Sequence, residues 1–155
     1  MPHELPGPGA GPEPRQPIHA FAASAGLLFL LVGIAGFIPG VTSNDDELAF
    51  AGPDSAAKLC GLFEVSVLHN IVHLLFALGL IAAARVAWSR IYLLGGGAAY
   101  LLVALFGAVV ERESDANFLP INTADNLLHL ALGVSMIALG ILGIRLSRGR
   151  PTRFP

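Results

Sequence analysis

Four polar residues occur at helical spacing inside a long apolar segment, and their side chains are the ones best suited to chemistry. They are Ser66, His69, Asn70 and His73, at positions i, i+3, i+4 and i+7, so a single helix would carry them on one face. Two imidazoles one turn apart can bind the same metal ion. Asn70 follows the first histidine where zinc peptidases have a glutamate base, so the sequence does not support peptidase chemistry.

A second apolar segment repeats this spacing with Asn122, Asp125, Asn126 and His129. We call these eight residues the polar seam. If the two helices face each other, Asp125 and His129 would supply third and fourth ligands to an ion bound by His69 and His73. Three nitrogens and one oxygen suit zinc, iron or copper. A haem held between facing histidines is a related alternative.

The polar seam can also be explained by helix packing alone. Hydrogen bonds between membrane helices contribute about 0.6 kcal/mol each, and short polar seams often serve only this purpose. Asn122 followed by Asp125 is also typical of a helix N-cap and its partner at the third position. The pairs expected from packing are Asn70 with Asn126, Ser66 with Asn122, and His73 with His129.

A third interpretation is a ligand or proton site open to the outer face of the membrane. The histidines would titrate there, with Glu64 and Asp125 at its mouth. Catalysis is the least supported option, because Cys60 lies outside the seam and Ser66 beside a histidine is a generic arrangement. The sequence therefore leans towards a protein that is not an enzyme.

Composition places these helices in a membrane. The chain has 155 residues, of which 54% are hydrophobic and 13% charged, far from the composition of a soluble domain. Four stretches lack charged residues for about 20 positions, which is the length needed to cross a bilayer. The lipid bilayer is thus the expected partner, and no basic patch suggests nucleic acid. The expected spans are about 20–39, 63–84, 91–110 and 123–144.

Positive residues predict the orientation of the four spans. Seven of the nine lysines and arginines fall on one side, so both termini and the connector 85–90 should face the cytoplasm of a plasma-membrane protein. Residues 1–17 form a Pro/Gly-rich tail expected to be disordered, residues 18–146 the transmembrane domain, and residues 147–155 a basic tail. Asp54 or Ser55 is expected to cap a helix that extends the second span outward.

The two halves of the seam predict an internal repeat. Residues 63–73 align with residues 119–129, mostly apolar with apolar and polar with polar. Because the second and fourth spans run in the same direction, the repeat is parallel, with a pseudo-two-fold axis along the membrane normal. The expected fold is an all-α membrane protein of two parallel-related helical hairpins, with the second and fourth helices meeting across the bundle.

Several longer motifs occur in the order typical of one family. They are G-F-I-P-G-V-T-S-N, S-A-A-K-L-C-G-L-F-E-V-S-V-L-H-N-I-V-H, Y-L-L-G-G-G and N-F-L-P-I-N-T-A-D-N-L-L-H-L-A-L-G. From Gly36 to about Gly140 the chain resembles the small bacterial membrane proteins grouped as domain of unknown function 4383. The resemblance implies four transmembrane helices and no activity. The family would have Gln at Glu64 and an aliphatic residue at Cys60, so neither residue is given a role.

Two functions follow from the sequence. The first is a structural or interaction module, whose buried seam in the outer half of the bilayer fixes helix packing, with a second copy or another membrane protein as partner. The second is a protein that binds a metal, a haem or a small ligand through the same histidines. Metal content and haem absorbance of the purified protein would separate the two.

Overall fold

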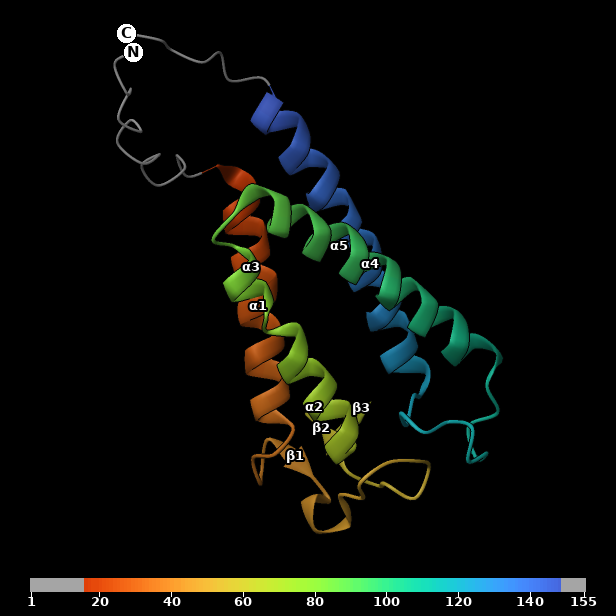
Figure 1. The fold of residues 1–155 in the computed structure, drawn as a ribbon. Coiled ribbons are helices and arrows are strands. Elements are labelled where there is room, and N and C mark those ends of the chain that lie inside the picture. Colours follow the sequence, from red (N-terminus) through yellow and green to blue (C-terminus); the bar gives the residue numbers. More distant parts are fainter. Residues whose placement is uncertain (1–15, 149–155) are drawn as a thin grey trace, which may run out of the picture.

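A computed structural model describes residues 16–148 as a mostly helical protein with one small sheet (Figure 1). The predicted tails, residues 1–17 and 147–155, lie almost wholly outside the described residues, although the first helix already begins at Pro17. The helices are α1 (Pro17–Ala35), α2 (Val67–Phe76), α3 (Gly79–Ala82), α4 (Val86–Val109) and α5 (Thr123–Arg148). The remaining elements are the strands β1 (Thr42–Ser43), β2 (Lys58–Leu59) and β3 (Phe63–Glu64) and the 3₁₀ helix η1 (Asp45–Glu47).

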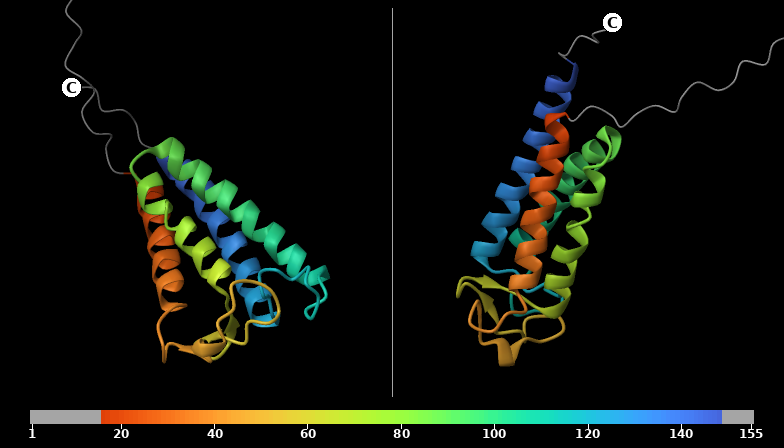
Figure 2. Two further views of the ribbon diagram at one scale, coloured as in Figure 1. Left: turned by 60° about the horizontal axis from the view of Figure 1, so that its bottom comes forward. Right: turned by 90° about the vertical axis from the view of Figure 1, so that its left-hand side faces the viewer.

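The helices form two neighbouring hairpins. α1 packs along α2 and α3, which follow one another in the same direction, and α4 packs along α5 (Figures 1 and 2). α1 also contacts α4 and α5 and so joins the two hairpins. The start of α1 and the end of α5 lie at one end of the bundle, and the small sheet and its loops lie at the other (Figure 1).

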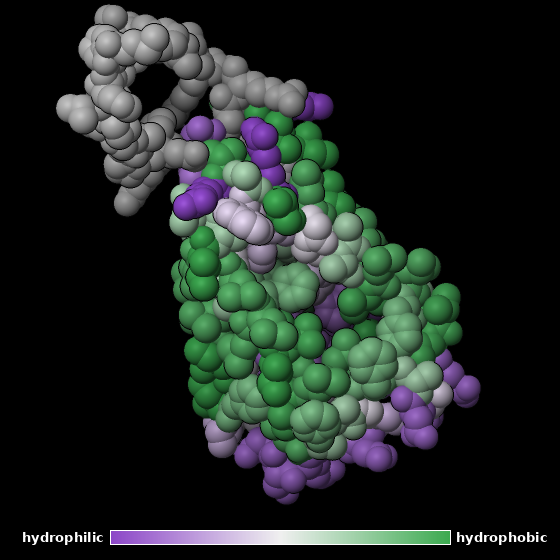
Figure 3. Space-filling model, viewed as in Figure 1, coloured by the Kyte–Doolittle hydropathy of each residue, from purple (hydrophilic) through white to green (hydrophobic). Residues whose placement is uncertain are grey.

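Three helices are long and apolar enough to cross a membrane, namely α1, α4 and α5 up to Leu146. A shorter apolar pass, Val67–Ala82, is made by α2 and α3 together. The face seen in Figure 3 is hydrophobic along its middle, and hydrophilic residues gather at the two ends. These features indicate a membrane protein with helices in roughly the predicted number.

The second pass differs from the single helix predicted over residues 63–84. α2 ends at Phe76, whose carbonyl oxygen accepts a hydrogen bond from the Tyr92 hydroxyl at 2.9 Å. In a continuous helix the Leu80 N–H would donate to that carbonyl oxygen. It donates instead to the Ala77 carbonyl oxygen at 2.9 Å. The Tyr92 ring also presses on Gly79, where a Cβ would lie 2.4 Å from a ring carbon. A side chain from α4 therefore divides the predicted helix.

The outward extension of this helix from Asp54 or Ser55 is wrong. The segment forms a three-stranded antiparallel sheet in the order β1-β2-β3, pairing Ser43 with Lys58 and Lys58 with Glu64. The Ser55 hydroxyl caps no helix but donates to the Val65 carbonyl oxygen at 2.6 Å. We call residues 42–66 the loop cap, because they close the end of the bundle where α2 begins (Figure 1).

Small residues bring α4 and α5 close together. A Cβ added to Gly97 would lie 2.9 Å from the Gly133 carbonyl oxygen, so the two backbones are nearly in contact. This agrees with the close approach that the glycine-rich stretch 95–97 favours in a lipid environment. The core shared by the two hairpins contains the buried residues Ile18, Ala22, Phe29, Leu93, Tyr100 and Met136.

Candidate metal centre

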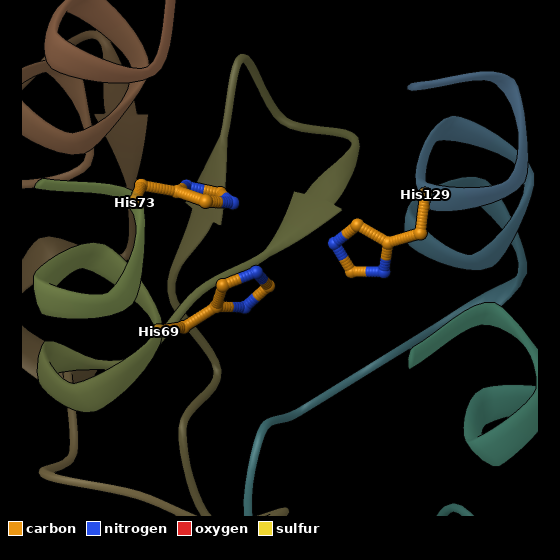
Figure 4. A group of neighbouring side chains, drawn as sticks. All are labelled: His69, His73 and His129. Carbon is orange, nitrogen blue, oxygen red and sulfur yellow. The ribbon is translucent and has the colours of Figure 1, made fainter. Parts of the chain in front are cut away.

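Three histidines from two hairpins converge between the helices. His69 and His73 come from α2 and His129 from α5, and each ring directs one nitrogen towards the other two (Figure 4). One potential ligand atom from each ring lies within 4.8 Å of the others. Their exposed fractions are 3%, 6% and 3%. We call these three residues the histidine cluster.

The helix starts place these rings. The Ser66 hydroxyl caps α2 by accepting a hydrogen bond from the His69 N–H at 3.1 Å, which fixes His69 in the first turn. His73 lies one turn further on the same face, and the two ring centroids are 4.7 Å apart. His129 faces them from α5, with its ring centroid 5.7 Å from that of His69.

Aromatic side chains surround the cluster on the side away from the loop cap. Phe29 lies with its ring centroid 6.1 Å from that of His73, and Tyr100 lies 5.4 Å from His129. Tyr100 also stacks on Phe29 and meets Phe76 edge to face. The sequence motifs did not identify Tyr100. Its only signal was a polar tip in the middle of an apolar span.

A cavity of about 70 Å³ adjoins the histidines. It lies between α2, α4 and α5, and apart from the cluster its walls are apolar or aromatic. Figure 3 shows a hollow in the hydrophobic face between α2 and α4, with hydrophilic atoms at its floor. The lining residues are His69, Val72, His73, Phe76, Ala99, Tyr100, Val103, Leu119 and His129.

The histidine cluster leaves hydrogen-bonding capacity unused. In each of the three rings the buried Nδ1 has no hydrogen-bond partner among the described residues. The buried Tyr100 hydroxyl is also without one in this part of the chain. Buried polar groups are nearly always paired, and these four atoms belong to residues that line one cavity, where a ligand, an ion or water can pair with them.

Asp125, predicted as the fourth ligand, is engaged elsewhere. Its Oδ2 accepts the Glu64 N–H of β3 at 3.0 Å and the Asn122 N–H at 3.1 Å. Asn122 in turn accepts the Asp125 N–H at 3.0 Å, which is the N-cap arrangement that the sequence offered as an alternative. Asn122 also donates to the Leu62 carbonyl oxygen at 2.9 Å. The start of α5 is thereby tied to the loop cap, and the group of convergent ligand atoms contains only the histidines.

The two central asparagines of the seam contact glycines rather than each other. Asn70 donates to the carbonyl oxygen of Gly36, at the end of α1, at 2.9 Å. A Cβ at Gly36 would lie 2.1 Å from the Asn70 side-chain oxygen, so only glycine fits there. Asn126 packs against Gly107 of α4, where a Cβ would lie 2.6 Å from its oxygen. The predicted pairs Asn70–Asn126, Ser66–Asn122 and His73–His129 are not among the hydrogen bonds of residues 16–148.

Comparison with known proteins identifies one family. Residues 19–142 match the family described as Domain of unknown function (DUF4383). Neither the curated proteins nor the solved structures contain a match to the chain.

Proposed function

The chain belongs to the DUF4383 family, whose description assigns no activity, and we propose from the chain's own geometry that the histidine cluster binds one transition-metal ion. The observation that carries this proposal is the convergence of three buried ring nitrogens within 4.8 Å of one another. Imidazole nitrogens bind zinc, copper, iron and nickel. The site would provide three protein ligands and leave one position free, as metal sites that bind a further ligand do.

The distances are close to those of a bound site. A metal bound to nitrogen at about 2.1 Å with tetrahedral angles holds its ligand atoms about 3.4 Å apart. The ligand atoms of the cluster lie within 4.8 Å, so they must approach by at most about 1.4 Å. Small rotations about the side-chain bonds of His73 and His129 supply such a movement without moving α2 or α5.

The absence of a negatively charged ligand in the histidine cluster favours an ion of low charge. The three ligands are neutral when they coordinate, and Asp125, one turn from His129, already accepts two backbone hydrogen bonds. A divalent ion would keep an uncompensated double charge in an apolar region, which is costly, whereas a cuprous ion carries half of it. We therefore expect the site to bind Cu⁺ more tightly than the preference of this soft ion for soft ligands would predict. Zn²⁺ serves as the divalent ion for comparison.

The cavity favours an ion over a haem. Its volume is about 70 Å³, whereas pockets for ligands of drug size measure about 300–1,000 Å³. A macrocycle between His73 and His129 would have to displace Phe76 and Tyr100, which pack edge to face with ring centroids 4.8 Å apart. Both belong to or pack against the central core.

A structural or interaction module remains the second candidate function. It is supported by the roles of the other seam residues, since Ser66 and Asn122 cap helices and Asn70 closes the end of α1. In that case the histidines would fill space between the hairpins, and a second copy or another membrane protein would act as partner. The unused nitrogens of the cluster weigh against this candidate.

We further infer that the two hairpins are duplicated units with both termini in the cytoplasm of a plasma-membrane protein. The matched N-caps support the duplication: Ser66 and Asn122 each accept the N–H of the residue three positions later. The excess of arginine near the chain ends supports the orientation. The histidine cluster would then lie in the outer half of the bilayer, below the loop cap.

The test is a metal titration of the full chain in mild detergent. Cu⁺ is delivered from a chromogenic chelator and Zn²⁺ in a parallel series, and bound metal is measured per chain. Binding of one ion per chain, lost in His73→Ala and His129→Ala, is expected. His19→Ala is the matched control, because His19 lies at the start of α1 and its ring bonds the Ala83 carbonyl oxygen.

Absence of binding in the correctly folded wild type would reject the metal proposal and leave the structural module. Equal binding by wild type and both cluster variants would place the metal elsewhere and reject it as well. A haem absorbance band from the purified protein, lost in the same variants, would replace the ion with the macrocycle.

A further inference from the structure

The cavity beside the histidine cluster is suited to a second molecule. We infer that it admits a small uncharged molecule with a lone pair, of about two or three heavy atoms, which occupies the free position of the metal. This inference rests on the proposed metal site and names the class of ligand that the site would take. The class of ligand follows from the volume, the walls and the opening of the cavity.

The volume limits the size of the molecule. A water molecule needs about 10–15 Å³ of such space, and a dry engineered cavity of about 150 Å³ accepts benzene. The cavity measures about 70 Å³, which is about half of that volume. A diatomic or triatomic molecule fits, whereas an organic substrate with a ring does not.

The walls select against charge. Apart from the histidines and Tyr100, the lining consists of apolar side chains such as Val72, Val103 and Leu119. An anion entering this space would lose its hydration without finding a charged partner other than the metal. An uncharged molecule has little hydration to lose, so the cavity favours it over an anion of equal size.

Tyr100 provides a hydrogen-bond donor at the same cavity. Its side chain is 4% exposed, it lines the cavity, and its hydroxyl has no hydrogen-bond partner in residues 16–148. Tyr92, also on α4, differs, because its hydroxyl is occupied by the Phe76 carbonyl oxygen. A ligand that binds the metal at one end and accepts a hydrogen bond from Tyr100 would satisfy the hydroxyl.

The opening faces the hydrophobic surface. The hollow in Figure 3 lies between α2 and α4 in the green middle of the molecule, away from its hydrophilic ends. Molecules that dissolve in lipid would therefore reach the cavity from the hydrocarbon side without crossing the loop cap.

Carbon monoxide on the Cu⁺-loaded protein tests this inference. It binds Cu⁺ without electron transfer, and only a bound water, where one is present, leaves. We expect one infrared C–O stretching band that shifts with ¹³CO and disappears in His129→Ala. Tyr100→Phe should retain Cu⁺ but shift the band, because the hydrogen bond from the hydroxyl is lost.

A matched pair of substitutions on α4 tests the cavity itself. Ala99 lines the cavity, whereas its neighbour Ala98 is exposed and does not. Ala99→Leu should weaken carbon monoxide binding at least tenfold with Cu⁺ still bound, and Ala98→Leu should leave it unchanged.

The outcomes separate this inference from the metal proposal. If neither Cu⁺ nor Zn²⁺ binds, the metal proposal fails and the ligand inference fails with it. If metal binds but carbon monoxide gives no band, the metal proposal stands and the ligand inference is overturned. Equal carbon monoxide binding by Ala99→Leu and wild type would also overturn it.

Discussion

The polar seam has two parts that differ in how completely their polar atoms are used. Beside the loop cap, Asp125 accepts hydrogen bonds from two backbone N–H groups, and Asn122 takes part in three hydrogen bonds. In the histidine cluster, one buried nitrogen of each ring has no partner among the described residues. Asp125 and His129 are equally buried, with exposed fractions of 2% and 3%.

This difference shows which polar groups the fold itself needs. The bonds of Asp125 and Asn122 join α5 to the sheet, so removing them would loosen the closed end of the bundle. The buried Nδ1 of each histidine ring has no hydrogen-bond partner among the described residues, yet its burial costs free energy. A buried polar atom that costs stability and has no hydrogen-bond partner is the one for which a ligand has to be sought.

Metal addition should separate the two parts most strongly. At a free Cu⁺ concentration about 100 times the dissociation constant, binding stabilises the folded state by about 2.7 kcal/mol, which raises Tm by about 5–10 °C for a chain of this size. His129→Ala should abolish this increase. The measurement is thermal unfolding in detergent with and without Cu⁺, with His19→Ala as control. An equal increase in His129→Ala would contradict the role of the cluster.

Removal of the Asp125 carboxylate should affect the other part. Asp125→Ala leaves the partly buried N–H groups of Glu64 and Asn122 without their acceptor, so we expect a loss of about 1–3 kcal/mol in unfolding free energy. Cu⁺ affinity of the folded fraction should stay within about threefold. Asp125→Asn keeps one acceptor and should lose less stability. A loss of Cu⁺ affinity without a loss of stability would instead make Asp125 a ligand.

Ser66, the N-cap of α2, lies between the two parts, and its substitution should have an intermediate effect on the unfolding free energy. Ser66→Ala removes the acceptor of the His69 N–H and should cost about 1 kcal/mol, measured by chemical unfolding. Ser66→Gly, which caps better than alanine, should cost only a few tenths of a kcal/mol. Because Ser66 orients the first turn that carries His69, Ser66→Ala should also weaken Cu⁺ binding. Unchanged Cu⁺ binding would show that packing alone orients His69.

The sequence was sufficient where the information is local. The spacing of His69 and His73 predicted one shared helix face, and the structure brings their rings together with the ring of His129 from the other helix. The cap formed by Asn122 and Asp125 was also visible as a sequence pattern, although the same residues were considered as ligands. Local patterns offer such alternatives, and tertiary contacts choose among them.

The features that sequence analysis missed depend on distant partners. α2 ends at Phe76 because Tyr92 of another helix takes its carbonyl oxygen, and no local pattern contains that contact. The strands of the loop cap have two residues each, too short for an alternating pattern, and β1 pairs with β2 across a long loop. The interhelical asparagine pairs were not formed because glycines let Asn70 and Asn126 reach neighbouring helices instead.

The smallest effect is expected at the one ion pair of the loop cap among residues 16–148. Lys58 Nζ lies 3.7 Å from Glu64 Oε1, and the two side chains are 42% and 29% exposed. Such exposed pairs contribute about 0–1 kcal/mol, so Lys58→Ala and Glu64→Gln should each change unfolding free energy by less than about 0.5 kcal/mol. Glu64 stabilises the fold through its backbone N–H, which Gln retains. If Glu64→Gln cost as much as Asp125→Ala, the carboxylate rather than the backbone would hold the loop cap, and its stability should then fall with added salt.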